Sequence, residues 1–107
     1  MIVKSCTIRP KWWIYMANNK STHLYVLRCG NRLKIGVTSD IEQRIVSLQT
    51  GNPDKIELEY IEERLNPHKA EKFLHRHFQK HKVSGEWFEG ISLHEIRVRL
   101  MLFFDQE

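Results

Sequence analysis

Two β-rich segments separated by a tight turn restrict the fold of this chain more than any other feature. Residues 24–28 and 33–37 consist mainly of the branched and aromatic side chains that favour strands. Between them lie Gly30 and Asn31, which are typical of a two-residue turn joining antiparallel strands. The sequence therefore predicts a β-hairpin with its turn at these two residues.

The register of this hairpin assigns its side chains to the two faces of a sheet, because side chains alternate along a strand. One face is wholly apolar and is expected to cover the core: Leu24, Val26, Leu33, Ile35 and Val37. On the other face Tyr25 lies opposite Gly36 and diagonal to Lys34, about 7–8 Å away at the backbone. A phenol and an ammonium group are therefore expected side by side, next to open space above the glycine.

A helix is predicted directly after the hairpin. Ser39 or Asp40 caps it, and it ends near Thr50, before Pro53. Its inward stripe consists of Ile41, Ile45 and Leu48. Arg44 flanks that stripe and is expected to point toward the sheet more than toward solvent.

Three further elements complete the predicted domain. Residues 56–63 alternate in polarity and predict a third, half-exposed strand. Asn66 and Pro67 open a helix to about residue 82, and a capping box at Ser92 opens the last helix. The order ββαβαα predicts an α+β fold, in which helices flank a small three-stranded antiparallel sheet.

Residues 1–20 lack this periodicity and are expected to form an N-terminal extension of uncertain order, ahead of a domain of residues 21–107. Trp12 and Trp13 in this extension either close the core or form a sticky surface. A homodimer or a protein partner bound through the extension is therefore expected as one option. No apolar run has the length of a membrane span or of a secretory leader, so no membrane association and a cytoplasmic location are expected.

Positive charge is unevenly distributed along the chain, which carries a net charge of +4. Residues 1–50 hold eight Lys and Arg against two acids, and residues 64–82 hold six with Glu71 as the sole acid. This balance favours a partner that carries phosphate, such as DNA. Lys72 and Arg76, on the helix predicted within the second cluster, could follow a nucleic-acid backbone or simply form a solvated helix surface.

The element order and several short motifs resemble the GIY-YIG nuclease superfamily, especially its compact branch from phages and bacteria. HLY at residues 23–25 and KIG at residues 34–36 stand where this family has its two signature triplets. The run KIGVTSD…R…LQTGNP, followed by AEKFLH and GEWF, is the more specific part of the likeness. Arg44 matches the helix arginine of the family, and Glu71 matches its metal-binding glutamate.

This resemblance implies a metal-dependent DNA endonuclease that hydrolyses phosphodiester bonds with one divalent cation, Mg²⁺ or Mn²⁺, in each active site. Glu71 would hold the cation, and Arg44 would pair with phosphate oxygens as negative charge develops. Tyr25 would position the attacking water or act as its base. Lys34, as a neighbouring cation, is expected to lower the pKa of that phenol.

The resemblance also extends to secondary residues and leaves alternatives open. His75, one turn after Glu71, is expected to touch phosphate or a metal-bound water. The expected nucleic-acid contacts are Lys34, Arg44, Lys72 and Arg76. Leu48 and Val83 depart from the family, where many members have Tyr or His and Asn respectively. These departures keep open a DNA-binding or partner-regulating protein that does not cleave, and a protein-interaction module using Trp12 and Trp13 is a third interpretation.

Taken without the resemblance, each of these residues has a plainer interpretation. Tyr25 could be an ordinary strand aromatic that packs in the core. Arg44 could lie over the helix edge toward acids of the third strand, and Glu71 could form a surface ion pair of little energetic value.

Overall fold

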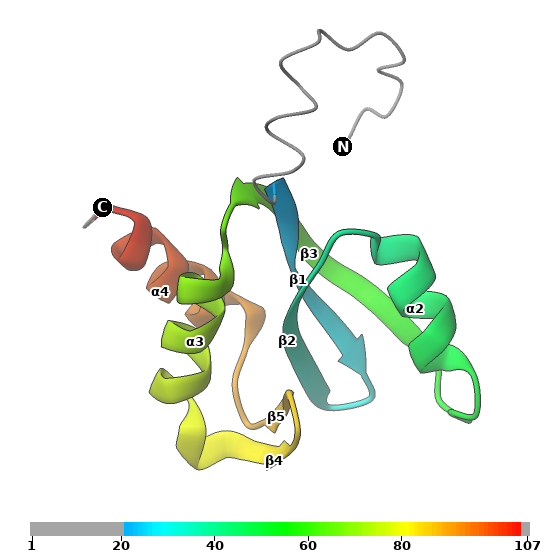
Figure 1. The fold of residues 1–107 in the computed structure, drawn as a ribbon. Coiled ribbons are helices and arrows are strands. Elements are labelled where there is room, and N and C mark those ends of the chain that lie inside the picture. Colours follow the sequence, from blue (N-terminus) through cyan, green and yellow to red (C-terminus); the bar gives the residue numbers. More distant parts are fainter. Residues whose placement is uncertain (1–20, 106–107) are drawn as a thin grey trace, which may run out of the picture.

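The computed structural model describes residues 21–105, which form one antiparallel sheet with helices on both of its faces (Figure 1). The strands are β1 (Ser21–Cys29), β2 (Arg32–Thr38), β3 (Ile56–Leu65), β4 (Lys82–Ser84) and β5 (Trp87–Glu89). The helices are α2 (Ile41–Gln49), α3 (His68–His77) and α4 (Leu93–Asp105). Strand order in the sheet is β3-β1-β2-β5-β4. The α+β class is confirmed, but the expected three-stranded sheet is wrong, because the sheet has five strands.

The register predicted for the first hairpin is confirmed. Tyr25 pairs with Gly36, and Leu27 pairs with Lys34. Gly30 occupies the turn with φ of 66°, a left-handed conformation that glycine adopts without steric cost. The turn residues and the alternation of side chains were therefore sufficient to fix this part of the fold.

The two additional strands arise from the segment after α3, for which the sequence predicted no strand. Helix α3 ends at His77, earlier than the expected end near residue 82, and a 3₁₀ turn follows at Gln79–His81. The chain then forms the β4–β5 hairpin, with Gly85 at its turn. β5 pairs with residues 32–34 of β2 and so continues the sheet. Three-residue strands are too short for alternation to reveal them.

Capping groups mark the starts of two helices as the sequence predicts. The Asp40 side chain accepts a hydrogen bond from the Gln43 backbone nitrogen at 3.1 Å, at the start of α2. Ser92 and Glu95 exchange two hydrogen bonds as a capping box before α4. Helix α3 differs, because Pro67 takes the capping position without a side-chain hydrogen bond.

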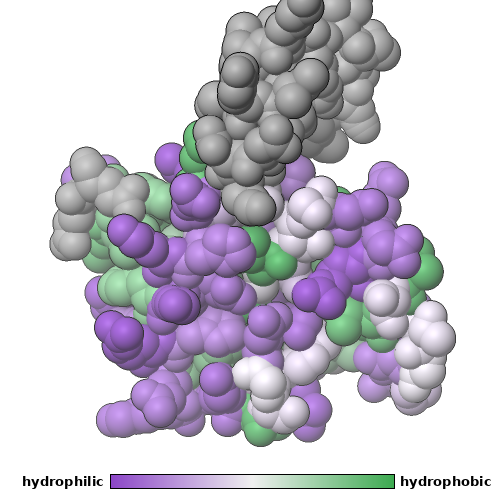
Figure 2. All heavy atoms as spheres, in the orientation of Figure 1, coloured by the Kyte–Doolittle hydropathy of each residue, from purple (hydrophilic) through white to green (hydrophobic). Residues whose placement is uncertain are grey.

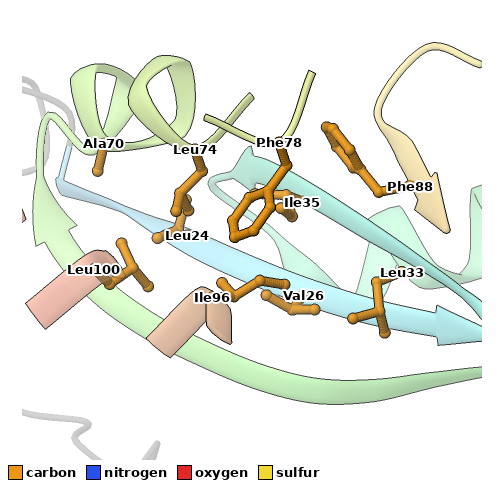
Figure 3. Packing of buried hydrophobic residues seen from close by; sticks show 10 residues of the cluster. All are labelled: Leu24, Val26, Leu33, Ile35, Ala70, Leu74, Phe78, Phe88, Ile96 and Leu100. Atoms are coloured by element: carbon orange, nitrogen blue, oxygen red, sulfur yellow. The ribbon is translucent and has the colours of Figure 1, made fainter. Parts of the chain in front are cut away.

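The main core lies between the sheet and the pair α3–α4 (Figure 3). It consists of Leu24, Val26, Leu33, Ile35, Ala70, Leu74, Phe78, Phe88, Ile96 and Leu100. The opposite face is also covered, since Tyr25 and Leu27 are fully buried and α2 packs over them. Figure 1 shows α2 across the hairpin from α3 and α4. The sheet face that carries Tyr25, where open space was expected above the glycine, is therefore buried under the apolar stripe of α2.

None of the helices within residues 21–105 combines the length and the apolar character needed to cross a membrane. The expectations for residues 1–20, including a partner contact through Trp12 and Trp13, lie outside the described part of the chain.

Candidate functional site

The missing side chain of Gly36 lets two polar groups approach the same point beside β2. A Cβ atom placed on Gly36 would lie 2.5 Å from the hydroxyl oxygen of Tyr25 and 2.9 Å from Oε1 of Glu86. Carbon atoms of side chains do not approach oxygen so closely. Only glycine at this position therefore leaves room for both the phenol and the carboxylate beside β2.

Replacing Gly36 with alanine is expected to lower the free energy of unfolding by about 1–3 kcal/mol, because Tyr25 or Glu86 must move to admit the methyl group. Chemical denaturation measures this loss. Ser39→Ala, at an exposed position just beyond β2, is the matched control and should change little. Equal stability of the Gly36→Ala and wild-type proteins would contradict the close approach.

Lys34 is held by Glu86. Its residue is only 8% exposed, and its ammonium nitrogen lies 3.2 Å from Oε1 of Glu86. The same nitrogen lies 5.4 Å from the centroid of the Trp87 ring. A buried ammonium group needs a charged or polar partner, and Glu86 supplies it. A backbone hydrogen bond of 3.2 Å from the Ile35 nitrogen to the Glu86 carbonyl keeps this turn against β2.

Tyr25 is a buried phenol whose hydroxyl has no hydrogen-bond partner among residues 21–105. Burial raises its pKa above 10.0, Glu86 and Glu71 add to the rise, and Arg44 opposes it. The expected lowering of this pKa by Lys34 is therefore wrong. The cation that acts on the phenol is Arg44, while Lys34 is paired with Glu86.

Arg44 extends from α2 toward the same region. Its Nε atom is buried and, like the Tyr25 hydroxyl, has no hydrogen-bond partner within the described residues. Its effect on the pKa of Tyr25 shows that the guanidinium group lies near the phenol. Buried polar groups are rarely left unpaired in native proteins, and on β1 the Thr22 Oγ1 and His23 Nδ1 atoms also lack partners among the described residues.

Glu71 reaches this region from α3, and its side chain is 18% exposed. Burial raises its pKa above 4.5, and the neighbouring carboxylate of Glu86 raises it further, whereas His75 and His68 oppose the shift. Glu71 and Glu86 also line the same pocket. The site therefore contains two neighbouring carboxyl groups, of which the sequence predicted one.

His75 connects α3 to β2 beside these carboxyl groups. Its Nε2 atom lies 2.9 Å from the carbonyl oxygen of Ile35, to which it donates, and 4.0 Å from Oε2 of Glu71. Its ring also meets Phe88 edge-on, with centroids 5.0 Å apart. These contacts give His75 a structural role next to Glu71. The expected contact with phosphate or water would be an additional role.

A pocket of about 470 Å³ opens beside the carboxyl pair. Its lining residues are Glu71, Lys72, His75, Arg76, Lys82, Gly85 and Glu86. Lys72, Arg76 and Lys82 are exposed, so they form a cationic rim around the acids. Hydrophilic side chains also dominate the described part of the face in Figure 2. A larger pocket, of about 630 Å³, lies between β3 and α4 and contains none of the predicted site residues.

The donor atoms suit a hard divalent cation. Within residues 21–105, no three His, Cys, Asp or Glu side chains are grouped as a metal cluster. The two carboxyl groups of Glu71 and Glu86 are nevertheless adjacent at an open pocket. Mg²⁺ and Mn²⁺ take carboxylate oxygens, and Mg²⁺ usually keeps several waters, so a site with few protein ligands fits it.

The structure thus brings together most of the predicted site and adds one residue to it. Tyr25, Arg44 and Glu71 converge, and Lys34 joins them through Glu86. Glu86 was missed because GEWF served only as part of the resemblance. The sequence feature that could have identified Glu86 is an acidic residue directly after a turn glycine. Val83, which stands where the family often has asparagine, is 41% exposed on β4, and Glu86 is the residue of this hairpin that faces Glu71.

The α+β domain thus places cations and carboxyl groups around one pocket beside its sheet. The chain belongs to the T5orf172 domain family, whose sequence pattern matches residues 13–102. This is a phage-associated domain related to nucleases of the HNH and GIY-YIG kinds. Comparisons with curated proteins and with solved structures gave no match. The narrower likeness to GIY-YIG nucleases stays a prediction.

Proposed function

We propose that this protein is a metal-dependent endonuclease that hydrolyses phosphodiester bonds in DNA. The observation that carries the proposal is the convergence of Tyr25, Arg44 and Glu71, from a strand and two helices, beside a pocket with a cationic rim. The ring of Tyr25 packs in the core, but its hydroxyl group and the Arg44 Nε atom lack partners within the described residues, and Glu71 neighbours a second acid.

The chemistry of the residues suggests a role for each. Glu71 would hold Mg²⁺ or Mn²⁺, which would supply Lewis-acid polarisation of the phosphate. Arg44 would pair with a phosphate oxygen as negative charge develops, because a guanidinium group remains charged and can donate two hydrogen bonds at once. Lys72 and Arg76 would contact backbone phosphates on either side of the scissile bond.

Tyr25 would act as a neutral phenol when the reaction begins. Its pKa is raised, chiefly by burial, so the hydroxyl group keeps its proton at neutral pH. In this state it can orient an attacking water through a hydrogen bond but cannot accept a proton from it. The proton that the water loses would pass to solvent in the open pocket beside Glu71. Lys34 would contribute charge toward the phosphate and His75 would keep α3 in place.

A DNA-binding protein that does not cleave is the second candidate. It is favoured by the raised pKa of Tyr25 and by the ion pair that occupies Lys34. Both features work against water activation but not against binding of a phosphate backbone.

Plasmid nicking distinguishes the two candidates. Purified protein with Mg²⁺ or Mn²⁺ is expected to convert supercoiled plasmid to the open circle, and chelation with EDTA should stop the reaction. Glu71→Ala, purified in the same way, controls for contaminating nucleases and should shift DNA in a gel without cutting it. Equal DNA binding by both proteins without nicking by either would favour the second candidate.

A further inference from the structure

We propose that Glu86 is a second carboxylate ligand for the divalent cation and that Lys34 competes with the cation for this carboxylate. The inference rests on the proposed function in one respect, which is that Glu71 is the other ligand. It adds Glu86 to the site, and it couples binding of the cation to the availability of the Lys34 charge for a phosphate group.

The first support is the proximity of two acids that belong to distant segments. Glu71 comes from α3 and Glu86 from the turn between β4 and β5, yet both line the same pocket of about 470 Å³. Two ionised carboxylates that are neighbours and partly buried repel each other. A divalent cation bound between them would offset this repulsion, so the arrangement is favourable when the cation is bound.

The second support comes from the buried phenol. The hydroxyl group of Tyr25 is fully buried, has no hydrogen-bond partner among the described residues, and approaches the same point above Gly36 as Oε1 of Glu86. A water on the cation could accept or donate a hydrogen bond there. The pocket of about 470 Å³ beside both acids leaves room for such waters.

In the absence of the cation, Lys34 holds Glu86 in an ion pair. The ion pair of 3.2 Å occupies Oε1, and the largely buried ammonium group depends on this partner. Once Glu86 turns to the cation, the ammonium group loses its partner and becomes available for an anionic phosphate oxygen. Binding of the cation would therefore prepare Lys34 for the DNA backbone.

Mn²⁺ binding by the full chain without DNA tests this inference, with the electron paramagnetic resonance signal of free Mn²⁺ as the readout. Glu86→Gln is expected to weaken binding about tenfold or more. Lys34→Met should strengthen it several-fold, because it removes the competing cation. Glu89→Gln, on neighbouring β5 and paired with exposed Arg32 at 3.4 Å, is the matched control and should bind as the wild type does.

The double variant Lys34→Met/Glu86→Gln controls for misfolding, because it removes both charges of the ion pair and leaves neither one buried without a partner. It is expected to show the same loss of Mn²⁺ affinity as Glu86→Gln, with an unchanged circular dichroism spectrum. Wild-type affinity in this double variant would overturn the inference, as would failure of the wild type to bind Mn²⁺. Loss of binding in Glu71→Gln alone, with nicking by the wild type, would overturn the role of Glu86 and leave the proposed function intact.

Discussion

Replacing Glu71 with glutamine is expected to reduce metal-dependent nicking about 10²-fold or more and to stabilise the folded protein at neutral pH. The loss of activity follows from the loss of the carboxylate that would hold the cation. The gain in stability follows because the substitution removes one of two neighbouring, partly buried carboxylates. Plasmid nicking and urea denaturation of the same preparations measure the two effects.

The pH dependence of this stability difference has a defined sign. Because the pKa of Glu71 is raised above 4.5 in the folded state, its protonated form contributes stability that is fully present below pH 4.5. This contribution is lost as the pH rises through the raised pKa, so the wild type and Glu71→Gln should differ most at neutral pH. Glu57→Gln, at an exposed position on β3, is the control. A less stable Glu71→Gln protein at pH 7 would mean that the fold itself uses the carboxylate.

Local sequence signals were sufficient to predict the hairpin, but they were not sufficient to predict which element covers it. Gly30 and Asn31 fixed the turn, and alternation fixed which residues face each other across β1 and β2. The burial of Tyr25 depends instead on where α2 packs, which is a tertiary contact. A strand tyrosine beside a glycine looks the same in sequence whether a helix or solvent lies above it.

The resemblance predicted those candidate site residues that lie in a recognisable motif. It missed the residue that reaches this region through the pairing of short strands. Tyr25, Arg44 and Glu71 come from long, recognisable elements. Glu86 enters the site because β5 pairs with β2, and that pairing involves only three residues of each strand. The expected effect of Lys34 on the phenol failed for the same reason, since Glu86 neutralises it.

Replacing Tyr25 with phenylalanine is expected to reduce nicking about 10²-fold or more while leaving the protein at least as stable as the wild type. The hydroxyl group is buried without a partner, so its removal should raise the free energy of unfolding, by about 1 kcal/mol. Urea denaturation at pH 8 measures this change. Since the pKa of Tyr25 is raised above 10.0, the neutral phenol contributes stability that is fully present below pH 10 and lost as the pH rises through the raised value. The phenylalanine variant should lack that alkaline loss.

Tyr60→Phe is the matched control, because the same hydroxyl group is removed from a tyrosine with a partner. Tyr60 donates a hydrogen bond of 2.6 Å to Oε1 of Glu62, which together with burial raises its pKa to about 12. Its loss should therefore lower stability by about 1 kcal/mol without affecting nicking. Opposite signs at the two positions would identify the Tyr25 hydroxyl as a group kept for chemistry at the expense of stability. If Tyr25→Phe instead lost stability and kept full nicking activity, the phenol would be an ordinary part of the core, and water activation would have to depend on the cation and its ligands alone.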